Sequence, residues 1–151
     1  VETAFEMLEA CWKPFEKVDV LIMAAAVADY MPESYQPKKI KKSQGISEIT
    51  LKPTPDILKE LAGRKKHQFI VGFAAETDDL EDNALKKIQD KNLDLIIAND
   101  ITKGIFGSDS TSISVIDREG SVSRYDKISK EEAAEIILDA IIDRLPPGIR
   151  E

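Results

Sequence analysis

Apolar runs alternate with amphipathic segments along the 151 residues of this chain. Continuous apolar runs at residues 18–24, 68–73 and 93–98 are typical of strands that are buried on both faces of a sheet. Segments with apolar residues at helical spacing predict helices at residues 3–16, 54–63, 79–90 and 129–145. Strands and helices that alternate in this way predict an α/β fold, with a mostly parallel, doubly wound sheet and helices on both of its faces.

Short sequence signals mark where the helices begin and which faces they bury. Ser129 followed by Glu132 is a capping box for the last helix. Thr54 before Pro55 predicts the N-cap and first residue of the second helix. The residues expected to face the core are Phe5, Leu8, Trp12 and Phe15 in the first helix and Ala134, Leu138, Ile141 and Leu145 in the last.

Two further regions lie between these elements. Residues 111–117 and 121–126 alternate with period two around a Gly-containing turn, and they predict an antiparallel hairpin near the C-terminus. Residues 30–46 hold prolines, a glycine and many polar residues, and they predict a long loop followed by a short strand at 47–51. Loops of this length are uncommon inside compact domains and are usually functional.

Composition and charge describe one globular domain over residues 1–151. Apolar residues make up 42% and charged residues 32%, and no apolar run is long enough to cross a membrane. The single cysteine, Cys11, excludes an internal disulfide and is typical of a reducing compartment, so a cytoplasmic location is expected. The net charge of −7 argues against broad nucleic-acid binding, which needs a basic face, so small-molecule partners are expected.

The usual nucleophiles and metal ligands are scarce. The only histidine, His67, lies in a polar junction before a strand and is interpreted as a surface residue. Cys11 lies beside the apolar stripe of the first helix and is interpreted as inert. These assignments exclude Ser-His-Asp, Cys-His and histidine-based zinc chemistry, and the chain contains neither GxxxxGK[ST] nor GxGxxG.

Positive charge near strand ends is the chemical feature that is left. Four lysines fall within five positions of an acidic chain: Lys38, Lys39, Lys41 and Lys42. Such a cluster is either a solvated loop or an anion site, because the like charges repel one another until an anion joins them. Lys87 and Lys91 are four residues apart, hence on one helical face, and form either surface ion pairs or a second anion contact.

The end of the first predicted strand favours the anion-site interpretation. Small residues at 24–26 let a ligand approach the backbone, and Asp29 follows them. Open α/β sheets bind ligands at the carboxyl ends of their strands. The helix start at Pro55-Asp56 could hold an anion through its free N–H groups. Lysines and helix ends without a histidine base suit phosphoryl or nucleotidyl transfer.

Five segments occur in an order that we identify with a known family. They are Ala25-Ala26-Val27-Ala28-Asp29-Tyr30, Lys39-Ile40-Lys41-Lys42, Pro55-Asp56-Ile57, Val71-Gly72-Phe73-Ala74-Ala75-Glu76-Thr77 and Lys91-Asn92-Leu93-Asp94-Leu95-Ile96. Over residues 18–145 the chain resembles phosphopantothenoylcysteine synthetase, the second half of the bifunctional bacterial coenzyme A enzyme. The resemblance implies a Rossmann-like homodimer that joins 4′-phosphopantothenate to L-cysteine. It also implies CTP as the bacterial nucleotide, Mg²⁺, and an acyl-cytidylate intermediate.

The resemblance also implies the residues of the site. The nucleotide contacts are Met23, Ala24, Ala25, Asp29, Lys39, Pro55, Asp56, Ile57, Leu58, Phe73, Lys87 and Lys91. Lys39 is the implied catalytic residue, Asp29 is expected to accept hydrogen bonds from ribose hydroxyls, and Phe73 either packs in the core or stacks on the base. Residues 30–46 are expected to close over the nucleotide, and no metal ligand is predicted.

One departure from the family and two alternatives stay open. The family's opening segment, a Gly-Gly-Thr stretch leading to an Asn-x-Ser-Ser-Gly turn, is expected before Val1, so the chain is interpreted as a truncated piece with weak or no activity of its own. A flavoprotein decarboxylase half, with FMN, could precede it. The alternatives are a nucleotide-binding module without ligase activity and a dinucleotide-dependent reductase, which needs a Gly-rich first turn.

Overall fold

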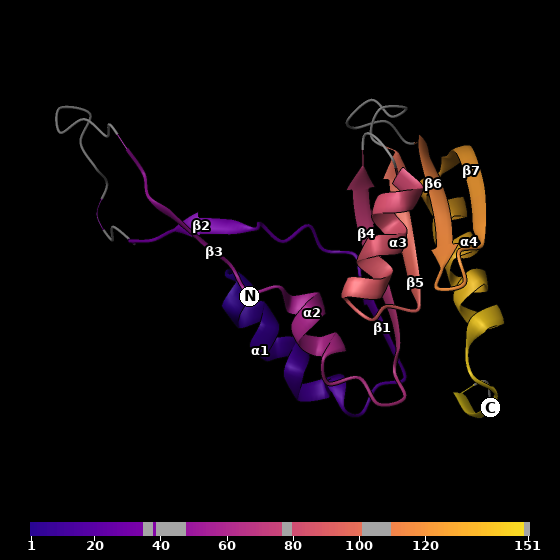
Figure 1. The fold of residues 1–151 in the computed structure, drawn as a ribbon, viewed down its shortest axis with the longest axis horizontal. Coiled ribbons are helices and arrows are strands. Elements are labelled where there is room, and N and C mark those ends of the chain that lie inside the picture. Colours follow the sequence, from indigo (N-terminus) through magenta and orange to yellow (C-terminus); the bar gives the residue numbers. More distant parts are fainter. Residues whose placement is uncertain (35–37, 39–47, 77–79, 101–109, 150–151) are drawn as a thin grey trace.

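A five-stranded sheet and a separate two-stranded ribbon organise the chain (Figure 1). The computed structural model describes residues 1–34, 38, 48–76, 80–100 and 110–149. The helices are α1 (Ala4–Phe15), α2 (Ile57–Ala62), α3 (Leu80–Asp90) and α4 (Lys130–Arg144), with a 3₁₀ turn at Pro147–Ile149. The strands are β1 (Val20–Met23), β2 (Tyr30–Pro32), β3 (Leu51–Pro53), β4 (Phe69–Glu76), β5 (Leu95–Asp100), β6 (Ser110–Asp117) and β7 (Val122–Ser129).

The main sheet has the strand order β1-β4-β5-β6-β7. β4 runs parallel to both β1 and β5, whereas β6 and β7 are antiparallel additions at the other side. This confirms the predicted parallel centre and the predicted C-terminal hairpin. β1 ends at Met23, opposite Gly72, while β4 continues to Glu76. The carboxyl ends of these two strands therefore form a step, and the chain leaves β1 there.

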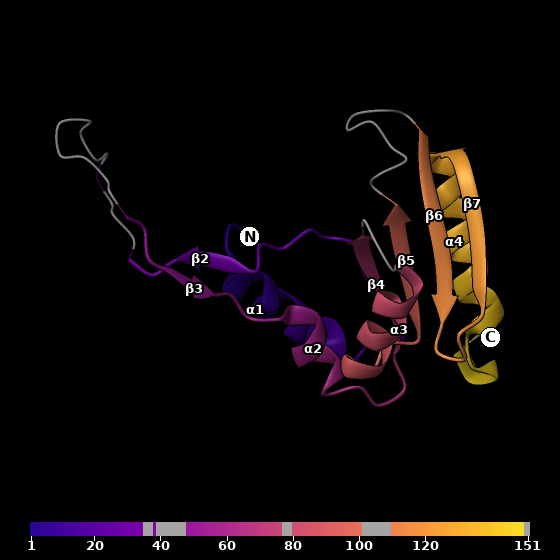
Figure 2. The same ribbon diagram turned by 45° about the horizontal axis from the view of Figure 1, so that its top comes forward.

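Helices cover both faces of the sheet, as predicted (Figures 1 and 2). On one face α1, α2 and α3 bury Leu8, Leu61 and Ile88 against the sheet. On the other face α4 buries Ile137 and Ile141 against the remaining strand residues. Fully burying one such aliphatic side chain is worth about 1.5–3 kcal/mol, so these two layers account for most of the packing that holds the sheet.

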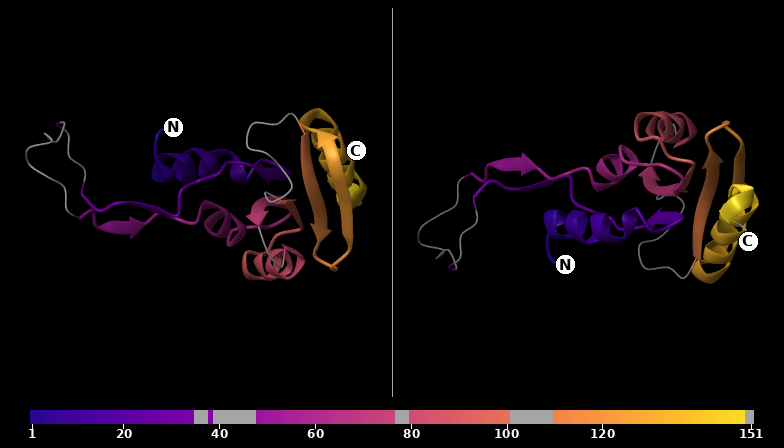
Figure 3. Two further views of the ribbon diagram at one scale, coloured as in Figure 1. Left: turned by 90° about the horizontal axis from the view of Figure 1, so that it is seen from above. Right: turned by 90° about the horizontal axis from the view of Figure 1, so that it is seen from below.

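The two-stranded ribbon corrects the prediction of a continuous loop at residues 30–46. β2 and β3 pair antiparallel, from Tyr30 opposite Pro53 to Pro32 opposite Leu51, and the ribbon projects away from the main sheet (Figure 3). The short strand predicted at 47–51 is thus found at Leu51–Pro53. Three-residue strands that each contain a proline carry almost no periodic signal. Residues 35–37 and 39–47 lie outside the described part of the chain.

The helix faces are only partly as predicted. The capping box is confirmed, because the Ser129 hydroxyl accepts from Glu132 N (3.0 Å) and the Glu132 carboxylate accepts from Ser129 N (2.8 Å). In α4, however, the buried stripe is Ala133, Ile137 and Ile141, and the predicted Leu138 is 50% exposed. In α1, Leu8 and Phe15 are buried as predicted and Phe5 is exposed. None of the helices in the described ranges is long and apolar enough to cross a membrane.

Candidate nucleotide site

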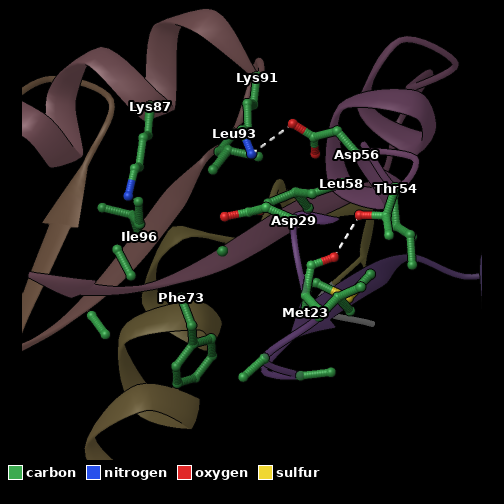
Figure 4. Close-up of a pocket in the computed structure, with 18 of the residues that line it drawn as sticks. Met23, Asp29, Thr54, Asp56, Leu58, Phe73, Lys87, Lys91, Leu93 and Ile96 are labelled. Atoms are coloured by element: carbon green, nitrogen blue, oxygen red, sulfur yellow. Dashed lines mark hydrogen bonds and ion pairs between the residues drawn. The ribbon is translucent and has the colours of Figure 1, made fainter. Parts of the chain in front are cut away.

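A cavity of about 420 Å³ opens at the step between the carboxyl ends of β1 and β4 (Figure 4). This volume is within the usual range for small-molecule sites. Ten of the twelve predicted nucleotide contacts line it: Met23, Ala25, Asp29, Pro55, Asp56, Ile57, Leu58, Phe73, Lys87 and Lys91. Ala24 lies in the same segment but does not line the cavity, and Lys39 lies outside the described residues. Residues far apart in the sequence thus meet around one space.

The floor of the cavity is formed by Gly72 in β4. A β-carbon at this position would lie 2.8 Å from Leu93 Cδ1 and 3.2 Å from Leu58 Cδ2. Both leucines line the cavity, so the missing side chain of Gly72 is part of its volume. Sequence reasoning did not select Gly72, although a glycine inside a predicted strand is a signal for close approach of a ligand or another chain segment.

Phe73 lies on the other face of β4. Successive strand residues point to opposite faces, so Phe73 points away from the side on which Gly72 contacts Leu58 and Leu93. Figure 4 agrees, since the ring lies on the side of the sheet away from Lys87 and Lys91. Phe73 thus lines the cavity with its ring on the side of β4 away from the lysines, which does not favour the expected stacking on a base held beside them.

Two hydrogen bonds hold the wall that follows β1. Thr54 Oγ1 donates to the backbone oxygen of Ala28 (2.5 Å), and Thr54 N donates to that of Asp29 (2.9 Å). They fix the segment of small residues against the start of α2, with Asp29 among the lining residues. Thr54 therefore joins the segment after β1 to the segment before α2. The prediction that Thr54 caps the helix is wrong, because the cap is Asp56.

Asp56 is the N-cap of α2. Its Oδ1 accepts from Lys59 N at 3.1 Å. Thr54 lies two positions before this cap, and its hydroxyl donates to the backbone oxygen of Ala28. The helix start at this position is thus closed by a carboxylate of the protein itself, which differs from the expected open anion site.

Lysines from α3 form the opposite wall. Lys91 N donates to Lys87 O (3.0 Å), so the helical path continues to Lys91 and both side chains lie on one helix face. Both line the cavity, and Lys91 Nζ lies 2.8 Å from Asp56 Oδ2. The dashed line in Figure 4 shows this ion pair joining α3 to α2. The cavity therefore combines two ammonium groups with two carboxylates, those of Asp29 and Asp56.

The surroundings of Asp56 set its protonation. Burial alone would raise the pKa of Asp56, but hydrogen bonds from Lys91 and from Lys59 N, together with the charges of both lysines, outweigh it and lower the pKa. Its charged form therefore stabilises the fold at neutral pH. That contribution is present above the unfolded-state pKa, about 3.9, and is lost as the pH falls through the lower folded-state value.

This sign gives a testable expectation for stability. Asp56→Asn keeps a good N-cap and removes the charge. We expect the wild type to be the more stable protein at neutral pH in urea unfolding, and the difference to shrink as the pH falls below about 4. A difference that stays constant down to the acid transition would contradict this assignment of the pKa shift.

The residues dismissed as unreactive lie away from the cavity. His67 Nε2 lies 3.3 Å from Asp19 Oδ1, both half exposed or more, at the amino ends of β4 and β1. Cys11 is a free, partly buried cysteine packed against the core. Within the described ranges no three or more His, Cys, Asp and Glu side chains gather as a metal site.

Comparison with known proteins places the chain in a family. The model of the DNA/pantothenate metabolism flavoprotein C-terminal domain matches residues 1–145. The chain is 41% identical over 145 residues to a cysteine/cysteine sulfinic acid decarboxylase from an unknown prokaryotic organism, covering 94% of this chain and 40% of that protein. It is 42% identical over 143 residues to the coenzyme A biosynthesis bifunctional protein CoaBC of Bacillus subtilis, covering 93% of this chain and 35% of that protein.

A solved structure gives the same result for the fold. The crystal structure of the C-terminal domain of a coenzyme A biosynthesis bifunctional protein CoaBC superposes with a TM-score of 0.76 at 37% identity, covering 93% of this chain and 62% of that one. The chain thus spans well under half of the two curated relatives and under two thirds of this domain. The predicted fold class and the predicted resemblance are both confirmed. The chain belongs to the DNA/pantothenate metabolism flavoprotein C-terminal domain family.

Proposed function

We propose that this chain is the nucleotide-binding part of a phosphopantothenate–cysteine ligase that uses CTP in coenzyme A biosynthesis. The observation that carries the proposal is the cavity at the ends of β1 and β4, lined by Lys87, Lys91 and Asp29. The relationship to CoaBC proteins supports the pathway. The chain likewise covers only 40% of the decarboxylase relative, so the activity in that name is not carried over to this chain.

The proposed reaction has two steps. An oxygen of the 4′-phosphopantothenate carboxylate attacks the α-phosphorus of CTP, and the bond to pyrophosphate breaks. The amine of cysteine then attacks the acyl carbon, loses a proton, and CMP leaves as the amide bond forms. Chemistry of this kind depends mainly on positioning and on neutralising developing charge.

The lining residues suit these demands. The ammonium groups of Lys87 and Lys91 would bind phosphate oxygens, and the carboxylate of Asp29 would accept hydrogen bonds from the ribose hydroxyls. The small residues beside Met23 leave the backbone accessible to the ligand. Lys39 is proposed to neutralise charge as the acyl-cytidylate forms and breaks down.

The cavity also suits Mg²⁺ that arrives with the nucleotide. Mg²⁺ keeps several waters and usually binds substrate phosphates plus one or two carboxylates. Asp29 and Asp56 are the carboxylates that line the cavity in the described residues, and no larger protein cage surrounds them there. When bound, the ion would add charge neutralisation on the phosphates. The protein's part would be to supply an oxygen of Asp29, because both oxygens of Asp56 already have partners in the protein.

The proposed partners follow from the same family. We propose a homodimer in the cytoplasm, with an upstream flavoprotein decarboxylase half as a possible fused partner. β1 lies at an edge of the main sheet. Ile22 of β1 is 42% exposed, and Phe73 of the neighbouring β4 is 38% exposed. Unpaired edges and apolar patches of this kind are usually covered by another segment or chain.

Two alternatives are separated from the ligase by simple assays. A nucleotide-binding module would bind CTP yet release no pyrophosphate with phosphopantothenate, cysteine and Mg²⁺. A dinucleotide-dependent reductase would bind a nicotinamide dinucleotide. The turn after β1, an Ala-Ala-Ala-Val-Ala run, contains no glycine, so it does not itself supply the Gly-rich turn that such a reductase needs.

A variant of the lysine cluster tests the proposed function. Lys39→Ala should weaken CTP binding and abolish pyrophosphate release, while its circular dichroism spectrum stays unchanged. Lys38→Ala removes the same charge one position earlier, at an exposed residue, and is the matched control. Equal behaviour of the two variants would assign the cluster to a solvated loop.

A further inference from the structure

The ion pair between Asp56 and Lys91 joins two residues that line the cavity. Lys91 Nζ and Asp56 Oδ2 are 2.8 Å apart, and the two side chains are 30% and 43% exposed. Asp56 belongs to the start of α2 and Lys91 follows the end of α3, so the pair joins two walls that are 35 positions apart in the sequence. One of the two lysines that line the cavity is thus already paired with a carboxylate of the protein.

The two oxygens of Asp56 have separate partners. Oδ1 accepts from Lys59 N, and Oδ2 accepts from Lys91 Nζ. If Lys91 moves, the carboxylate keeps its bond to the first turn of α2. Lys91, by contrast, has a long side chain with four rotatable bonds and an ammonium with three donors. The part of the pair that can move is therefore the lysine.

We propose that Asp56 is a positioning residue that holds Lys91 in the empty cavity and yields it to the phosphates of an incoming nucleotide. This inference rests on the proposed nucleotide function of the cavity. Half-exposed ion pairs are weak, so a polyphosphate can replace the carboxylate at small cost. A ligand with a single phosphate offers less charge and leaves the pair more often intact.

The exchange has a consequence for the proposed reaction. CTP carries three phosphates into the cavity, whereas CMP leaves with one. After pyrophosphate has gone, Lys91 would return to Asp56, and the spent nucleotide would lose one of its cationic contacts. Asp56 would in this way deny the monophosphate product its contact with Lys91, at the cost of somewhat weaker binding of the triphosphate.

Affinity measurements test the first half of this proposal. Asp56→Asn should keep the helix cap and bind CTP about two- to fivefold more tightly, because no ion pair has to break. Its effect on CMP should be smaller. Asp90→Asn, the same charge change next to Lys91 but outside the cavity lining, is the control and should leave both affinities unchanged. Weaker CTP binding by Asp56→Asn would overturn the proposal, as would an equal gain in Asp90→Asn.

A spectroscopic measurement tests the second half. With ¹³C-labelled lysine, the Lys91 ε-carbon resonance is assigned by its loss in Lys91→Met. Asp56→Asn should shift this resonance in the free chain and leave it unchanged at saturating CTP or inorganic triphosphate. A shift of the same size in both states would show that the pair persists, and would refute the exchange. Failure of the wild type to bind either probe would refute the nucleotide function as well. CTP binding with the same affinity in the wild type and in Asp56→Asn would refute the exchange alone.

Discussion

Lys87→Met should weaken CTP binding about ten- to a hundredfold and leave the fold intact. A charge-assisted hydrogen bond to phosphate is worth about 1.5–3 kcal/mol, and Lys87 is one of the two lysines that line the cavity in the described residues. Methionine keeps the length and the helix propensity of the side chain, so the charge is the main thing lost. Titration calorimetry with CTP gives the affinity.

The neighbouring residue provides the control for this prediction. Lys86 lies on the same helix, is exposed and does not line the cavity. Lys86→Met therefore changes the net charge by the same amount without touching the proposed site, and its CTP affinity should stay within a factor of about two, as expected for a screened surface charge. Equal losses of CTP affinity in both variants would show that Lys87 acts only through the net charge of the protein and makes no direct contact with the nucleotide.

Gly72→Val should destroy CTP binding and lower the free energy of unfolding by about 1–3 kcal/mol. Its β-carbon would enter the 2.8 Å approach to Leu93 and the 3.2 Å approach to Leu58, and two further methyl groups would fill the cavity floor. Both leucine contacts are flexible side-chain ends, so the chain should still fold, in a strand position that suits valine.

Gly148→Val separates the effect of the site from a general effect of the substitution. A β-carbon at Gly148 meets nothing within 4 Å, so this variant should match the wild type in stability and binding. Urea unfolding and calorimetry of both variants give the two quantities. Wild-type CTP affinity in Gly72→Val would show that the nucleotide binds elsewhere.

The sheet could be predicted because its strands are nearly continuous apolar runs. Successive residues are buried at Phe69–Val71 of β4 and at Leu95–Ala98 of β5, and such runs identify a parallel centre from the sequence alone. The buried face of α4 could not be predicted in the same way. Apolar residues occur on both sides of this helix, so the stripes through Ile137 and Leu138 compete, and only packing against β6 and β7 selects the first.

The candidate site also has features that the sequence could predict and features that it could not. The small residues after β1 and the two lysines at and after the end of α3 carry local signals, and the structure brings both to one cavity. The bond from Thr54 to Ala28 and the ion pair from Asp56 to Lys91 join positions 26 and 35 residues apart. Periodicity and motif spacing contain no information on such pairs. The error about the helix cap arose because Thr54 and Asp56 are both good caps, and no local signal shows that α2 begins at Ile57.

Calorimetric titration of the chain with CTP and with ATP tests the central claim most directly. The account predicts one saturable CTP site per chain and weaker binding of ATP, because polar groups arranged for cytosine would be left unpaired by adenine. The absence of CTP binding would contradict the assignment of the cavity as a nucleotide site, and an equal or tighter affinity for ATP would contradict its assignment to CTP.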